Sequence, residues 1–183
     1  AAIGARRGEE DSIFANPTVN DTDGNYTAGR FDTAREDTVT TGETGVRFNF
    51  DTGGIGHTVS VSGSTYELES KNAFAGSFGG VAGSIYNPTD VPSPAYTFSG
   101  GNLDHPQLTV KTQFDSVALS DQLSMLEERL LVTLGARYQN IQDKSYDYGG
   151  GPRNANYDDS ALTPTLGVLY KLRPSISLYA NYI

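Results

Sequence analysis

Histidines and acidic clusters are the residues of this chain best suited to metal binding or acid–base catalysis. His57 and His105 are the only histidines, and cysteine is absent. His57 follows a glycine-rich turn, whereas His105 lies in a proline-flanked loop, so the two fall at opposite ends of the expected strands. We therefore expect a polar turn residue and a polar loop residue rather than a shared metal site.

Three acidic groups have spacings that resemble known sites. Asp21-Thr-Asp-Gly-Asn25 matches the start of a calcium loop, but position 12 is Asp32 rather than the glutamate of an EF-hand, and its flanks are not helical. Glu127-Glu128 lies in a tight turn, and neighbours such as Asp158-Asp159 point to opposite faces of a strand. We interpret all three as solvated turn or strand residues. No G-x-S-x-G element or phosphate-binding loop is present, so the sequence predicts no catalytic residues and no bound metal or cofactor.

Alternating side chains dominate the elements that would position any site. Apolar residues occupy the even positions from Leu130 to Tyr138 and from Leu162 to Leu172, with polar residues between most of them. Period-2 alternation predicts strands with one apolar and one polar face. We expect strand-like segments at 1–7, 38–51, 56–69, 110–124, 129–144, 161–172 and 175–183.

The connections between these segments fall into two classes. Tight turns are expected at Thr52–Gly56, Leu123–Arg129 and Lys171–Ser175, and long polar loops at 10–37, 70–109 and 145–160. Short turns at one end and long loops at the other are typical of an outer-membrane barrel, whose tight turns face the periplasm. The sequence thus predicts an all-β antiparallel meander of about seven strands, part of a larger transmembrane β-barrel.

Composition constrains the possible partners. The formal net charge of −9 argues against nucleic acid, which needs a basic surface. No apolar run reaches the length of a membrane helix, but a barrel strand needs only about 9–11 residues. The chain has no signal peptide at Ala1 and stops at Ile183 inside a regular strand, so we expect an excised piece of a longer protein.

Three blocks of residues resemble one family. They are Phe50-Asp-Thr-Gly-Gly-Ile-Gly-His57, the stretch from Asp121 to Tyr138 with its D-x-L-S and V-T-L-G-x-R elements, and the stretch from Leu162 to Tyr182 with T-P-x-x-G-x-x-Y-K and S-L-Y-A-N-Y. In this order they resemble the barrel of TonB-dependent ferric siderophore receptors.

The resemblance implies a bacterial outer-membrane receptor that binds and imports ferric siderophores. Residues 1–183 would form an incomplete barrel without the plug domain. The siderophore, not the protein, would hold the iron, and an inner-membrane TonB complex would act through the missing plug. Outer-membrane lipid would cover the apolar face, which in the isolated piece would lead to self-association. The alternative is a soluble secreted β-sandwich acting as a binding or adhesion module, which would share the alternation and the glycine-rich turns.

Aromatic residues are the candidate ligand contacts. The chain has 11 Tyr and 8 Phe. Tyr138, Tyr170 and Tyr182 fit the interface girdle of a barrel, and Tyr179 should face inward. The resemblance implies that rings in the outer loops line the vestibule that captures the chelate, whereas packing of the loops among themselves explains each ring alone. The candidates are Phe74, Phe78, Tyr86, Tyr96, Phe98, Tyr146 and Tyr148.

Overall fold

A single antiparallel sheet forms the whole molecule. The computed structural model describes all residues from Ala1 to Ile183 and contains nine strands and no helix. No segment therefore forms a membrane-crossing helix. The strands are β1 (Ala2–Val19), β2 (Asn25–Thr52), β3 (Ile55–Gly76), β4 (Val81–Ser84), β5 (Phe98–Gly100), β6 (Gln107–Met125), β7 (Leu130–Tyr146), β8 (Arg153–Arg173) and β9 (Ile176–Tyr182).

Seven of these strands form the expected meander. Their order is β1-β2-β3-β6-β7-β8-β9, while β4 pairs with β2 and β5 pairs with β3 at the margin of the sheet. All pairs are antiparallel, and β1 and β9 remain as two separate edges. The single open sheet confirms the antiparallel prediction. The sandwich alternative is wrong, because a sandwich needs a second sheet facing the first.

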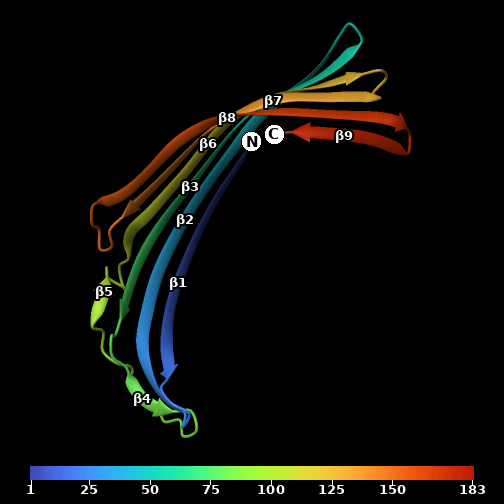
Figure 1. The fold of residues 1–183 in the computed structure, drawn as a ribbon. Coiled ribbons are helices and arrows are strands. Elements are labelled where there is room, and N and C mark those ends of the chain that lie inside the picture. The colour runs from blue at the N-terminus through green and yellow to red at the C-terminus, as the bar shows by residue number, and fades with distance from the viewer.

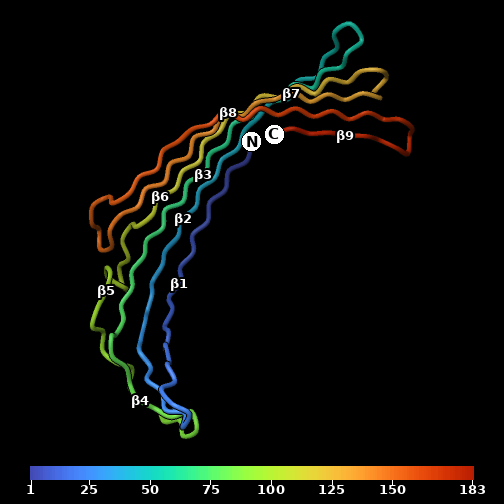
Figure 2. The backbone as a smooth tube through the Cα atoms, viewed as in Figure 1, coloured from blue at the N-terminus to red at the C-terminus, as the bar shows by residue number.

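The shorter connections lie at one end of the curved sheet and the longer ones at the other, as Figure 1 shows. The three tight turns lie at Gly53-Gly54, at 126–129 and at Pro174-Ser175, where the sequence predicts them. The connections at 20–24, 77–106 and 147–152 lie at the opposite end. The backbone trace in Figure 2 shows the inner strands of the meander running between these two ends, whereas β1 and β9 stop partway, where N and C are marked.

The strands extend much farther toward the long connections than predicted. The expected loop at 10–37 is mostly strand, because β1 and β2 pair from Val19↔Tyr26 onward. Likewise, β3 continues to Gly76 and β8 begins at Arg153. These extensions were missed because polar side chains lie on both of their faces, so period-2 alternation is lost although the backbone ladder continues.

The register places the predicted apolar rows on one face. Val46 pairs with Val61, Leu119 with Ala136, and Leu134 with Leu166, so successive strands align their apolar positions. Arg47, Thr133 and Arg137 lie on the opposite face, as expected. The apolar stretch from Leu130 to Tyr138 on β7 is nine residues long, which matches the about 9–11 residues of a membrane strand. We call this face the belt face and its opposite the inner face. Inner residues predicted by alternation are Arg47, Asn49, Asp51, Thr133, Arg137, Gln139, Lys171, Tyr179 and Asn181.

Candidate functional site

An aromatic cluster lies on the inner face at the end with the long connections. The Phe31 and Phe74 rings are stacked at 5.8 Å between centroids, and the Phe78 and Phe98 rings lie 4.4 Å apart. Phe98 also lies 6.3 Å from Phe31, and Tyr148 packs edge-on against Phe74 at 4.9 Å. The cluster therefore joins β2, β3, β5 and the β7–β8 connection.

Register and glycine positions bring these rings together. Phe31 pairs with Gly76, which also pairs with Phe98, so two rings flank one glycine. A Cβ atom at Gly76 would run into the Phe98 ring, and one at Gly100 would run into the Phe74 ring. Both glycines thus permit the close approach. Phe31, Phe74 and Phe98 are half-buried, whereas Phe78 is 82% exposed and Tyr148 48% exposed. The cluster presents apolar ring surface to solvent.

Tyr96 has a different environment from the cluster. Its hydroxyl donates a hydrogen bond of 2.6 Å to Asp32, and the Arg30 guanidinium lies 4.3 Å from its ring centroid. Arg30 Nε also donates to Asp32 at 3.0 Å, which satisfies a carboxylate that is only 5% exposed. We call Arg30, Asp32 and Tyr96 the latch, because they fix the 85–97 segment to β2.

The charges of the latch stabilise each other. The Arg30 hydrogen bond, followed by that from Tyr96, holds the pKa of Asp32 below its usual value although burial opposes this. The hydrogen bond to Asp32 raises the pKa of Tyr96 above its usual value. Asp32 therefore stays ionised and Tyr96 stays protonated at neutral pH.

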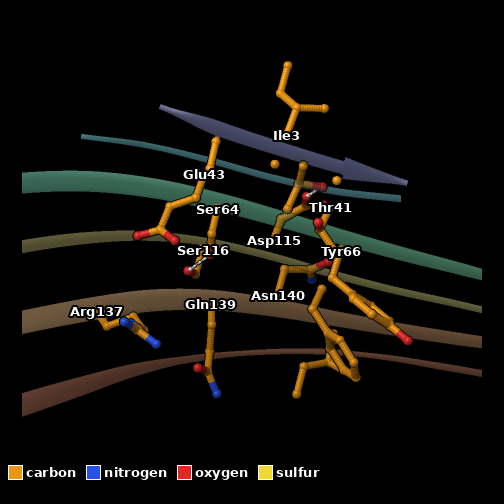
Figure 3. Close-up of a pocket in the computed structure, with 16 residues that line it drawn as sticks. Ile3, Thr41, Glu43, Ser64, Tyr66, Asp115, Ser116, Arg137, Gln139 and Asn140 are labelled. Atoms are coloured by element: carbon orange, nitrogen blue, oxygen red, sulfur yellow. Dashed lines mark hydrogen bonds between the residues drawn. The ribbon is translucent and has the colours of Figure 1, made fainter. Parts of the chain in front are cut away.

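A shallow hollow of about 530 Å³ lies midway along the sheet. Glu43, Ser64, Ser116 and Gln139 pair successively across β2, β3, β6 and β7, so their side chains form one polar row on the inner face. Figure 3 shows these side chains projecting to one side of the strands while Ile3 projects to the other. Ser64 and Ser116 are hydrogen-bonded at 2.9 Å. The hollow offers hydroxyl and amide groups together with the charged Glu43 and Arg137, while the second acid of its lining, Asp115, pairs with Thr65 and so lies on the belt face.

The acidic clusters serve local structure. Asp21 accepts hydrogen bonds from the Asn25 backbone at 3.0 Å and from its side chain at 2.7 Å, so it closes the β1–β2 turn as predicted. Asp158 accepts from Asn140 and Gln142 on β7. No group of three His, Asp or Glu side chains is close enough to hold a metal ion. His57 and His105 lie at opposite ends of the sheet, as the sequence indicated.

Comparison with known proteins identifies the sheet. A family model described as TonB dependent receptor-like, beta-barrel matches residues 7–183. The chain belongs to this receptor family. The ferrichrome receptor FcuA of Yersinia enterocolitica is 31% identical over 182 residues, which are 100% of this chain and 24% of that protein. The chain thus spans about a quarter of its relative's length.

Solved receptors share the fold. BauA of Acinetobacter baumannii, described as a ferric preacinetobactin receptor, matches with a TM-score of 0.68 at 24% identity over 99% of this chain and 26% of that one. The siderophore receptor PiuA of the same species matches with a TM-score of 0.61 at 14% identity, covering 97% and 28%. As a TonB-dependent receptor barrel, the chain belongs to the bacterial outer membrane.

The structure brings together four of the seven rings predicted as ligand contacts: Phe74, Phe78, Phe98 and Tyr148. Tyr86 lies apart in the same connection, Tyr146 ends β7, and Tyr96 belongs to the latch. Sequence reasoning missed Phe31, because it lies in a polar stretch without alternation that was taken for a loop. No signal in the sequence marks Phe31, because its pairing with Gly76 in the β2–β3 ladder is seen only in the structure.

Proposed function

We propose that the whole receptor binds a ferric siderophore through the aromatic cluster and imports it in a TonB-dependent way. The observation that carries this is the gathering of rings from several connections on the inner face, at the end away from the tight turns. In a receptor barrel the long connections are extracellular. Rings fixed on a rigid scaffold supply contact area at low conformational cost.

The names of the relatives support the substrate class. One relative is a ferrichrome receptor, and the solved neighbours include receptors for other ferric siderophores. The iron is cargo held by the siderophore, so the chain itself needs no metal ligands. The inner face would contact the plug and water, lipid would cover the belt face, and the TonB complex would act on the plug. The receptor would act as a transporter and not as an enzyme.

Binding by the full-length receptor tests the proposal. Phe78→Ala and Tyr148→Ala remove the two most exposed rings of the cluster. We expect their combination to weaken binding of the cognate ferric siderophore at least tenfold, which corresponds to about 1.4 kcal/mol. The measurements are labelled-iron binding and uptake by intact cells, with surface expression quantified in parallel.

Tyr86→Ala is the matched control, because Tyr86 is an exposed ring of the same connection with no contact to the cluster. It should leave the apparent affinity within about twofold. Normal affinity in the double variant at normal expression would remove the cluster from ligand binding. A loss with Tyr86→Ala alone would move the site toward the tip of that connection.

A further inference from the structure

Two ionisable groups interrupt the belt face beside the tight turns. On the belt face, β3 presents Val61, Val59, His57 and Ile55, and β6 presents Leu119, Asp121 and Leu123. We call the part of the belt face beside the tight turns the belt: residues 46–52 of β2, 55–63 of β3, 117–125 of β6, 130–138 of β7, 162–172 of β8 and 176–182 of β9. Among the belt-face side chains of these ranges, His57 is the only histidine and Asp121 is the only acidic or basic side chain besides it. In the receptor this position faces lipid near the periplasmic boundary, because tight turns of outer-membrane barrels are periplasmic.

These two residues interact closely with each other and with the hairpin. His57 Nδ1 lies 2.7 Å from Asp121 Oδ2, and His57 Nε2 lies 2.5 Å from Thr52 Oγ1. The imidazole also stacks on Phe50, with centroids 4.8 Å apart and planes 7° apart. Thr52, His57 and Asp121 therefore form a chain of hydrogen bonds that links the β2–β3 hairpin to β6. We call this chain the clasp.

The order hydroxyl–imidazole–carboxylate is also that of a nucleophile, its base and an orienting acid. Catalysis would further need free backbone N–H groups to stabilise an oxyanion. Here the neighbouring backbone pairs in the β2–β3 and β3–β6 ladders, so no such groups are presented. The imidazole is only 18% exposed. The geometry favours a structural use of the three groups.

The clasp provides hydrogen-bond partners for polar groups that would have none in lipid. A polar group exposed to hydrocarbon without a partner is unfavourable because no water is present to bond it. Both ring nitrogens of His57 have partners within the clasp, and so does one oxygen of Asp121. The other carboxylate oxygen, Oδ1, is buried without a partner, so the surrounding lipid cannot reach it. His57 is thus the side chain that provides Asp121 with a hydrogen bond.

We propose that the clasp is an assembly determinant of the barrel, which locks the periplasmic end of the β2–β3 hairpin onto β6 as these strands enter the membrane. His57 acts as a positioning residue: its imidazole is hydrogen-bonded to Thr52 of the hairpin and to Asp121 on the next strand. The proposal rests on the position of the chain in an outer-membrane barrel and is independent of the transported ligand.

Single and double substitutions in the full-length receptor test this proposal. His57→Phe keeps a ring against Phe50 but leaves Asp121 unpaired at the lipid surface. We expect the ratio of folded to unfolded receptor to fall about tenfold, because removing one partner of a shielded hydrogen bond leaves the carboxyl group of Asp121 without its partner. His57→Asn can still donate to Asp121 and should restore part of this loss. The folded fraction is measured from heat-modifiable electrophoretic mobility after refolding into lipid vesicles.

The combination of His57→Phe with Asp121→Leu shows whether the loss comes from the broken His57–Asp121 interaction or from any change at position 57. Because two apolar side chains suit a lipid-facing surface, the double variant should fold within about twofold of the wild type. Thr65→Val with Asp115→Leu is the matched control: this pair is hydrogen-bonded at 2.7 Å on the same strands and face but outside the belt. A normal folded fraction for His57→Phe, or no recovery in the double variant, would overturn the proposal.

Discussion

Asp32 shows how a single buried charge fixes a long connection. The carboxylate lies under the 85–97 segment and is bonded by Arg30 from the same strand and by Tyr96 from the segment itself. This contact could not be predicted from the sequence, because 64 positions separate Tyr96 from Asp32 and no motif links them. Tyr96 could be selected from the sequence as an outer-loop ring, but its hydroxyl partner depends on the path of the backbone.

The pH dependence of the latch follows from its pKa directions. Because the pKa of Asp32 is lowered, its contribution is complete above about pH 4 and is lost as the pH falls through its lowered value. Because the pKa of Tyr96 is raised, its contribution is complete below about pH 10 and is lost as the pH rises through its raised value. We therefore expect limited proteolysis within residues 85–97 to be slow and constant between these limits.

Tyr96→Phe removes the donor and should increase cleavage of the 85–97 segment several-fold at neutral pH. Tyr86→Phe is the control, because no hydrogen bond involves the Tyr86 hydroxyl. The readout is the appearance of the cleaved fragment of the full-length receptor by mass spectrometry. Equal cleavage of wild type and Tyr96→Phe across this pH range would contradict the latch.

At the scale of strands and turns, alternation predicted only part of each element. The belt segments were found because lipid contact requires apolar side chains on one face while the inner face stays polar. The extensions beyond the belt have water on both faces, so their side chains carry no such pattern. The ring cluster lies in these extensions, which explains why sequence reasoning named several of its rings but not their grouping. The clasp was missed for another reason: His57 was interpreted only as a polar turn residue, and no motif links it to Asp121, which lies 64 positions away in the sequence.

The turn between β6 and β7 contains stored backbone strain. Leu126, Glu127 and Glu128 have φ angles of 56°, 56° and 64°, which are left-handed values unfavourable for residues with a Cβ atom. We expect Glu127→Gly to stabilise the folded receptor by about 1 kcal/mol, because glycine adopts this conformation freely. Urea-induced unfolding of the receptor in lipid vesicles gives the change.

Gly53→Ala is the control that makes the opposite change, from glycine to a residue with a Cβ atom. Gly53 has a φ angle of 57° and no atom lies within 4 Å of a Cβ placed there, so any change comes from the backbone alone. Its expected effect is a destabilisation of about 1 kcal/mol. Stabilities that move in the same direction for both variants would exclude backbone strain as the cause.

The whole molecule exposes its belt face in the absence of lipid. Val46, Phe48 and Leu119 are 56%, 55% and 55% exposed, and only ten residues of the chain are buried. Contiguous apolar patches beyond a few hundred Å² rarely stay uncovered in water. The predicted meander and the predicted faces therefore agree with the structure, whereas closure of the barrel requires strands beyond the edges β1 and β9.

The 183-residue chain by itself should self-associate in plain buffer. We expect detergent micelles to disperse the assemblies, because the micelle covers the belt face in place of lipid. Multi-angle light scattering, with and without detergent, measures the particle mass. A stable monomer in buffer that retains the β-sheet signal in circular dichroism would show that the belt face needs no cover.

The polar extensions of the strands also determine how far the aromatic cluster lies from the membrane. From Gly63, at the upper limit of the belt on β3, the strand continues for 11 more positions to Phe74. At about 3.3 Å per residue and a tilt of about 45°, this raises the ring cluster roughly 25 Å above the hydrocarbon. The cluster thus lies at the end of projecting strands and not at the membrane surface. At that height, large molecules in the surrounding medium can reach the rings without touching the lipid.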